Sequence, residues 1–188
     1  MYQIHSATFE SGILEDVRAH EALHDCRERR GWAIGLSVTS PKQSEVLLAA
    51  LSIKVNGRRL FDSVQCTYNL LEQRPALALQ QAHDVGMDII IKEGLANGRV
   101  LRHPAVLKYS ERLGCQPDQL ALACILAQPF RPRVLSGAVT PEQLTSNLLA
   151  SEIADQLKND QSLLQEIMES CAMESDAYWN ERSALPWN

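Results

Sequence analysis

The chain has 188 residues, a formal net charge of −5 at pH 7 and 45% hydrophobic residues. These values are typical of a globular protein with one core, and the length suits a single domain with at most a short appendage. The negative charge argues against nucleic acid as the main partner, because binding to a phosphate backbone needs a clustered basic surface.

Short apolar runs typical of strands alternate with helical patterns along the chain. The strands are expected at residues 2–5, 32–37, 61–66, 88–92 and 133–136. The helices are expected at residues 12–30, 43–53, 74–85, 103–113, 117–127, 141–149 and 154–173. The pairs Ser40-Pro41 and Thr140-Pro141 predict helix starts, each with a hydroxyl N-cap followed by proline at the first helical position.

Strands that recur about every 30 residues, with helices between them, indicate a parallel sheet. The apolar run Ile89-Ile90-Ile91 indicates a strand that is buried on both faces. Two architectures fit this pattern. One is a complete doubly wound sheet of five strands, and the other is part of a (β/α)8 barrel, which usually needs about 250 residues. The loop after the first strand lacks the GxGxxG fingerprint of many doubly wound folds.

The cysteines are five in number and scattered, with no CxxC pair and no zinc-like spacing with histidine. Such a pattern is typical of reduced thiols in a cytosol. No secretory leader follows Met1, and no apolar run is long enough to cross a membrane. We therefore expect a cytoplasmic protein with neither a metal site nor a membrane partner. His20 and His24 lie one helical turn apart, but no third ligand accompanies them.

Five strings along the chain carry a family resemblance. They lie, in order, at residues 2–6, 35–37, 61–72, 91–98 and 136–144, the last followed by Asn147. Together they resemble strands four to eight of the aldo-keto reductases. The resemblance implies an α/β fold, a partial (β/α)8 TIM barrel of five parallel strands, over residues 1–150. Residues 151–188 would form a C-terminal helical extension similar to the tail of some bacterial members.

The resemblance also implies a function, the NAD(P)H-dependent interconversion of carbonyls and alcohols on a small-molecule substrate. His5 would be the catalytic residue present, orienting the substrate carbonyl. The implied cofactor-binding residues are Ser37, Gln65, Lys92, Glu93, Gly94, Leu95, Gly137, Ala138, Val139, Thr140, Gln143 and Asn147. Ser37 and Gln65 would bind the nicotinamide carboxamide, the backbone after Lys92 would follow the pyrophosphate, and Asn147 would contact the adenine.

Three positions depart from the family pattern. Val38 replaces a common asparagine, and Lys92 replaces an aromatic residue that stacks on the nicotinamide. Gln143 replaces an arginine that pairs with the 2′-phosphate. A neutral amide suits a phosphate far less well than a guanidinium does. The cofactor is therefore expected to be NADP or NAD, with a weakened preference for NADPH.

The family's catalytic aspartate, tyrosine and lysine would lie on strands that precede Met1. None of Tyr2, Tyr68, Tyr109 and Tyr178 matches the tyrosine motif, so we expect a truncated chain that is inactive alone. The alternatives are a non-enzymatic half-barrel and a nucleotide-binding or interaction module. Exposed edges at the first and last strands would favour oligomers or pairing with a matching N-terminal half. Asp62 and Asn69 receive no role beyond loop packing.

Overall fold

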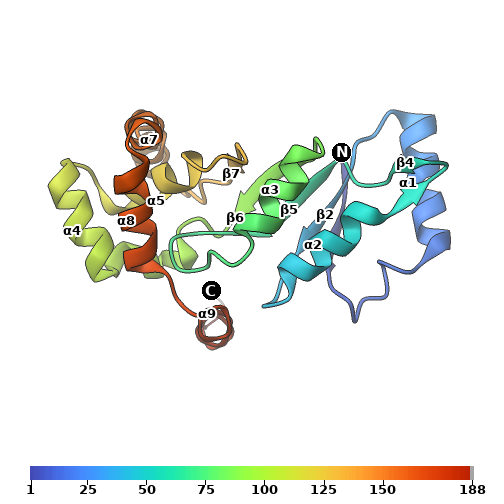
Figure 1. Ribbon diagram of the computed structural model, residues 1–188, viewed down its shortest axis with the longest axis horizontal. Coiled ribbons are helices and arrows are strands. Elements are labelled where there is room, and N and C mark those ends of the chain that lie inside the picture. Colours follow the sequence, from blue (N-terminus) through green and yellow to red (C-terminus); the bar gives the residue numbers. More distant parts are fainter. Residues whose placement is uncertain (187–188) are drawn as a thin grey trace. The chain divides into compact units, whose positions relative to one another are not determined.

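The computed structural model describes residues 1–186 and contains one five-stranded sheet in the order β1-β2-β5-β6-β7 (Figure 1). Its strands are β1 (Tyr2–Ala7), β2 (Ile34–Val38), β5 (Ser63–Thr67), β6 (Asp88–Lys92) and β7 (Arg133–Val134). The strands are parallel and follow one another in chain order. This order confirms the prediction of a partial barrel wall. It contradicts the doubly wound alternative, which requires a reversal of strand order.

The register between β1, β2 and β5 depends on a glycine. Gln3 lies opposite Gly35 on β2, and Gly35 lies opposite Ser63 on β5. A Cβ atom at position 35 would stand 2.3 Å from Ser63 Oγ and 2.9 Å from Gln3 Cγ. Because both neighbours crowd this point, only glycine lets the three strands approach to normal spacing. The core strand β2 is buried along its whole length.

The chain divides into two compact units. The first consists of Met1–Cys66 and Pro75–Ile90, and the second of Thr67–Arg74 and Ile91–Asn188, of which Trp187 and Asn188 lie outside the described residues. The first unit holds helices α1 (Val17–Arg30), α2 (Gln43–Ser52) and α3 (Ala76–Asp84). Asp16 caps α1 by accepting a hydrogen bond from Ala19 N, and α2 packs against α3.

Two details of the first unit differ from the sequence prediction. Ser40 is not the N-cap of α2, because its φ is +85° and Lys42 occupies the capping position without a side-chain bond. The Ser40 hydroxyl accepts from Lys42 N instead, which closes a local turn. The structure also contains an unexpected antiparallel hairpin, β3 (Lys54–Val55) and β4 (Arg58–Arg59). Asn56 and Gly57 both adopt positive φ in its turn, as a two-residue hairpin loop requires.

A buried ion pair lies where β5 begins. The Arg27 side chain is 5% exposed, and its Nη2 donates to Asp62 Oδ2 over 2.8 Å. The same guanidinium donates to the carbonyls of Arg59 and Leu60, and Asp62 Oδ2 also accepts from Ile34 N. Through these bonds Arg27 joins α1 to the loop before β5, and Asp62 joins that loop to the first residue of β2.

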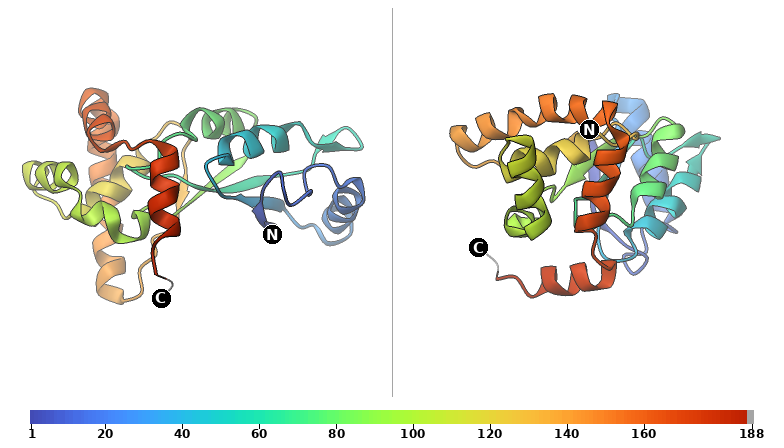
Figure 2. Two further views of the ribbon diagram at one scale, coloured as in Figure 1. Left: turned by 90° about the horizontal axis from the view of Figure 1, so that it is seen from below. Right: turned by 60° about the vertical axis from the view of Figure 1, so that its left-hand side comes forward.

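The second unit is mainly helical (Figure 2). Its elements are η1 (Ala96–Arg102), α4 (Pro104–Leu113), α5 (Pro117–Leu126), α6 (Pro141–Leu148), α7 (Ala150–Asn159), α8 (Gln161–Cys171) and α9 (Ser175–Ser183). The buried helix α5 packs against α7, and α8 contacts both α4 and α7. The prediction of one helix over 154–173 is wrong, because Asp160 ends α7 and caps α8 through Leu163 N.

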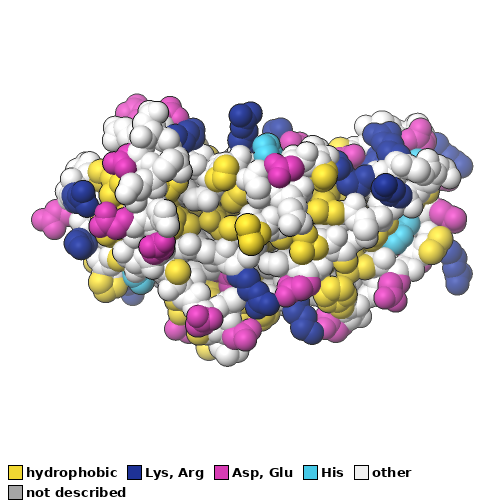
Figure 3. Space-filling view, viewed as in Figure 1, with side chains coloured by type: hydrophobic (Ala, Val, Ile, Leu, Met, Phe, Trp, Pro, Cys, Tyr) yellow, Lys and Arg dark blue, Asp and Glu magenta, His cyan; other side chains and the backbone are white. Residues whose placement is uncertain are grey.

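On the face that Figure 3 shows, acidic and basic side chains are interspersed, so this face has no extended basic surface. All five cysteines are free thiols. Within residues 1–186, no helix has both the length and the apolar character that a bilayer-spanning helix requires. The same residues contain no group of three or more metal-ligating side chains.

Candidate cofactor site

A pocket of about 700 Å³ lies in the second unit, bordered by the loop after β6, the start of α5 and the β7–α6 connection. Its lining residues are Leu95, Asn97, Leu101, Pro117, Asp118, Ser136, Gly137, Ala138, Val139, Gln143 and Asn147. The residues predicted from sequence to bind the cofactor that line this pocket are Leu95, Gly137, Ala138, Val139, Gln143 and Asn147. The fold therefore brings together residues that are up to 52 positions apart in the chain, from Leu95 to Asn147.

The β7–α6 connection is fixed by polar side chains at both of its ends. Ser136 Oγ accepts from Ala138 N at 3.1 Å, and the buried Asn147 donates through Nδ2 to Ser136 O at 3.2 Å. Gly137 supplies the positive φ, +68°, that turns the chain between these bonds. Asn147 thus holds the loop as well as lining the pocket, and its amide oxygen accepts no hydrogen bond that the structure gives.

The start of α6 forms as its sequence predicts. Thr140 is the N-cap and accepts from Gln143 N at 3.3 Å, and Pro141 follows at the first helical position. Gln143 Oε1 accepts from Val139 N at 2.9 Å, so the side-chain amide is bound to the loop. Together these two bonds join the side chains of Thr140 and Gln143 to backbone N–H groups at the start of α6.

The electrostatic character of the pocket follows from its lining. Among the described residues that line the pocket, Asp118 is the one with an ionisable side chain, and none is a lysine, arginine or histidine. The first turn of α6 contributes the partial positive charge of a helix N-terminus. The pKa of Glu142 in that turn is lowered by its own backbone N–H and by the Thr140 hydroxyl. The pocket suits a neutral, hydrogen-bonding group better than one with an additional phosphate.

The last residue of β6 and the loop after it hold three further predicted residues, Lys92, Glu93 and Gly94. Lys92 is half-buried. A Cβ atom at Gly94 would lie 3.2 Å from the side chains of both Leu122 and Ile125, so the loop backbone presses directly on α5. Glu93 has φ +56°, and its carboxylate binds the guanidinium of Arg182 rather than facing the pocket.

The first unit holds Ser37, Gln65 and His5 at strand positions. Ser37 lies directly opposite Gln65 across β2 and β5, which places the two predicted carboxamide ligands side by side. Ser37 is buried and Gln65 is partly exposed. His5 is exposed on β1, where the register with β2 shifts after Ile4, and its Nδ1 lies 3.0 Å from Ser6 Oγ.

Sequence reasoning missed several polar residues around the end of β5. Asn69 is fully buried and bonds to the backbone of Leu71, Glu72 and Glu93. It also donates to the Tyr178 hydroxyl, whose pKa burial raises to about 12. The nearest signal in the sequence is the Tyr68-Asn69 pair itself, because the partner Tyr178 is 109 residues away.

Comparisons with known proteins find several solved structures with a similar fold. No family model matches the chain. A putative voltage-gated potassium channel subunit beta from Schizosaccharomyces pombe is 40% identical over 52 residues, which are 28% of this chain and 15% of that protein. A thermostable aldo-keto reductase in complex with the inhibitor epalrestat is 22% identical, with a TM-score of 0.67 over 88% of this chain and 58% of its own.

Two further solved structures extend this picture. A mutant of the protein Gox0644 in complex with NADPH is 19% identical, with a TM-score of 0.67 over 99% of this chain and 63% of its own. The holo form of an aldo-keto reductase from Bacillus halodurans is 21% identical, with a TM-score of 0.63 over 92% and 62%. The chain thus spans less than two thirds of each of these proteins. Its fold is that of the aldo-keto reductases, present as an open part of their parallel barrel.

Proposed function

We propose that this chain is the cofactor-holding part of an NAD(P)H-dependent aldo-keto reductase, which interconverts carbonyls and alcohols of a small-molecule substrate. One observation carries the proposal. Residues singled out by the family resemblance converge on a single pocket at the start of α6, in a fold with a solved neighbour that was crystallised with NADPH. Helix N-termini and the C-terminal ends of parallel strands are common sites for nucleotides.

We propose the following roles for the predicted residues in binding a dinucleotide. The amide oxygen of Asn147 would accept from the adenine amino group, and the backbone of Ala138 and Val139 would border the adenosine. Ser37 and Gln65, adjacent across β2 and β5, would hydrogen-bond the nicotinamide carboxamide. His5 would orient the substrate carbonyl. The bound cofactor would supply the hydride, while these side chains only bind and orient.

The choice between NADPH and NADH depends on Gln143. Its amide oxygen accepts from Val139 N, and within residues 1–186 no cationic side chain lines the pocket. We expect the chain to bind NADH at least as tightly as NADPH. Gln143→Arg should raise the relative affinity for NADPH about tenfold, because one charge-assisted bond to phosphate contributes about 1.5–3 kcal/mol. Titration followed by the fluorescence of the bound nicotinamide measures both dissociation constants.

A matched control separates a local effect from a change in net charge. Gln156→Arg places the same charge on exposed α7, away from the pocket lining. It should leave the ratio of the two affinities unchanged. An equal shift in both variants, or none in Gln143→Arg, would contradict the placement of the 2′-phosphate beside residue 143.

Catalysis by the chain alone is not expected. Tyr68 and Tyr178 are buried, Tyr109 donates to Glu166, and Tyr2 does not match the family's tyrosine motif. Reduction requires a proton donor at the developing alkoxide. We therefore propose no turnover of aldehydes with NADPH or NADH. Turnover more than about tenfold above the uncatalysed background, and lost in His5→Ala, would show that another acid operates.

The two end strands of the sheet, β1 and β7, suggest how the chain is completed. Each end strand offers backbone groups that a further strand can pair with. We propose that these edges pair with a matching N-terminal half or with another copy in the cytoplasm. Sedimentation of the isolated chain should show oligomers, and co-expression with such a half should raise its solubility. A stable monomer with cooperative unfolding would contradict this proposal.

A further inference from the structure

Helix α9 makes polar contacts with three separate segments of the second unit. Ser175 donates to the buried carboxylate of Glu72 over 2.6 Å, in the segment that follows β5. Arg182 binds Glu93 in the loop after β6, and Glu181 pairs with Arg99 of η1. The helix therefore joins the loop after β5, the loop after β6 and η1.

The contact with Glu93 has the geometry of a strong ion pair. Arg182 Nη2 donates to Glu93 Oε1 at 2.6 Å, and Arg182 Nε donates to Oε2 at 2.9 Å. The Glu93 side chain is 13% exposed and that of Arg182 is 30% exposed. Two parallel bonds between a guanidinium and a carboxylate fix orientation as well as distance. The hydrogen bond to this carboxylate also raises the pKa of Arg182.

Tyr178 adds a further bond to the same carboxylate. Its hydroxyl accepts from Asn69 Nδ2 at 3.0 Å and donates to Glu93 Oε2 at 3.3 Å. The same Asn69 amide donates to Glu93 O at 2.9 Å. Glu93 is therefore held through its backbone and its side chain at once.

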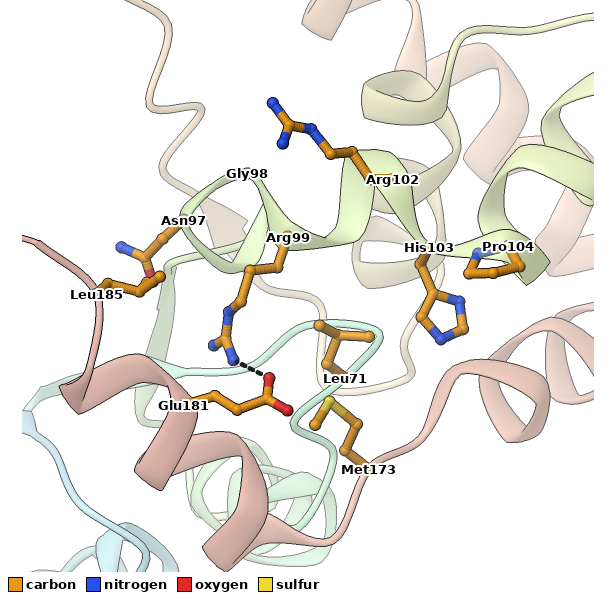
Figure 4. A pocket seen from close by; sticks show the side chains of 10 residues that line it. All are labelled: Leu71, Asn97, Gly98, Arg99, Arg102, His103, Pro104, Met173, Glu181 and Leu185. Atoms are coloured by element: carbon orange, nitrogen blue, oxygen red, sulfur yellow. Dashed lines mark hydrogen bonds and ion pairs between the residues drawn. The ribbon is translucent and has the colours of Figure 1, made fainter.

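Arg99 of η1 makes a second set of contacts with α9 (Figure 4). Its Nη1 donates to Glu181 Oε2 at 3.0 Å and to Tyr178 O at 3.3 Å. Its guanidinium lies 4.2 Å from the centre of the Tyr178 ring, and its Nε donates to Ala96 O at 3.1 Å. Figure 4 shows the Arg99 and Glu181 side chains pointing toward each other from η1 and α9, beside Leu71 and Met173.

The segment that α9 holds has an unfavourable backbone. Glu93, Ala96 and Asn97 all adopt left-handed φ values, +56°, +49° and +56°, although none is glycine. Such conformations persist only where surrounding contacts determine them. Leu95 and Asn97 of the same segment line the 700 Å³ pocket. The contacts of α9 therefore maintain one wall of that pocket from outside it.

We propose that α9 is a clamp for nucleotide binding, with Arg182 and Tyr178 as positioning residues that hold residues 93–97 in their binding conformation. The inference rests on the proposed function and adds a role for the C-terminal helix. It also assigns the Glu93 carboxylate to the clamp, which leaves the loop backbone as the group that contacts the cofactor. Arg182 itself touches none of the reacting atoms.

The test compares wild type with Arg182→Met and Arg182→Lys in the full chain. Hydrogen–deuterium exchange of residues 93–99 should be at least about tenfold faster in Arg182→Met, since opening is the step that the ion pair opposes. Exchange of residues 34–38 should be unchanged. The dissociation constant for NADH, measured by nicotinamide fluorescence, should rise about tenfold or more, corresponding to about 1.4 kcal/mol. Arg182→Lys should lie between the two.

Two further variants complete the design. Arg29→Met removes an exposed arginine that pairs with Asp25 on α1, and it should change neither measurement. If Arg182→Met fails to fold, Tyr178→Phe removes only the hydroxyl and should loosen residues 93–99 in the same direction.

The outcomes separate this inference from the proposed function. Unchanged exchange at residues 93–99 in the Arg182 and Tyr178 variants overturns the clamp, whether or not NADH binds. Faster exchange with unchanged NADH affinity overturns the positioning role. If wild type binds neither NADH nor NADPH, the proposed function and the positioning role both fail, and exchange alone decides whether α9 holds the loop.

Discussion

Replacing Asn69 with alanine should destabilise the second unit more than any other single polar substitution near the end of β5. Asn69 is 0% exposed. Its Oδ1 accepts from Leu71 N at 2.9 Å and from Glu72 N at 3.0 Å, while its Nδ2 donates to Glu93 O and the Tyr178 hydroxyl. Alanine would leave the two buried N–H donors without an acceptor.

The expected size follows from those two donors. An orphaned buried donor costs about 1–3 kcal/mol, so Asn69→Ala should lower the free energy of unfolding by about 2–6 kcal/mol. The lost bond to Glu93 O contributes less to this change in free energy, because Glu93 O also accepts from Ala96 N. The loss is a large fraction of a typical domain stability of about 5–15 kcal/mol.

Urea denaturation followed by circular dichroism measures this loss, with linear extrapolation to water. The matched control is Asn159→Ala, an exposed asparagine whose Nδ2 donates to Asp155 O at the end of α7. It should change stability by no more than about 0.5 kcal/mol. A loss below about 1 kcal/mol for Asn69→Ala would refute the reasoning, because it would mean that water or a shifted backbone satisfies both donors.

Three further predictions concern other buried groups. Arg27→Met should lower the free energy of unfolding in urea by about 2–4 kcal/mol. The substitution leaves Asp62 without its cation and removes the Arg27 donor from two carbonyls. A loss under about 0.5 kcal/mol would contradict this prediction. Burial raises the pKa of the Glu72 carboxyl. The stability that the protonated Glu72 carboxyl gives the fold is therefore full below the unfolded pKa of about 4.5, and it is lost as pH rises through the higher folded pKa. Wild type should lose stability over that pH window, and Glu72→Gln should not. A thiol reagent should modify Cys26 in the folded chain before Cys124, which is buried and whose pKa burial raises; equal rates would show frequent opening of α5.

The strands of the sheet could be predicted because their signal is local. The apolar run Ile89–Ile91 indicates β6, and the predicted strand, residues 88–92, has the same bounds in the structure. The hairpin β3–β4 was missed because each of its strands has two residues, too few for any alternation, although Asn56-Gly57 is a strong turn signal. Ser40 resembled an N-cap in sequence, but its positive φ sends the helix start two residues further on.

The candidate site could be predicted only on the side that a short motif covers. Residues 136–147 are consecutive, so their caps and turns follow from neighbouring side chains such as Thr140. The contacts of Glu93 depend on Arg182, which lies 89 residues further along the chain, and no local pattern specifies that pairing. Asn69 and Asp62 belong to the same class, since burial and distant partners give each its structural role.

Because the second unit is discontinuous in sequence, its long-range contacts form later during synthesis than those of the first unit. Residues 67–74 leave the ribosome before α9, yet Asn69 bonds to Tyr178, 109 residues later. At about 5–20 residues per second, that interval lasts about 5–20 s. The first unit ends at Ile90, whereas Asn69 and Glu72 in the segment after β5 form their bonds to Tyr178 and Ser175 only once α9 has been synthesised. Slower elongation lengthens this delay in direct proportion.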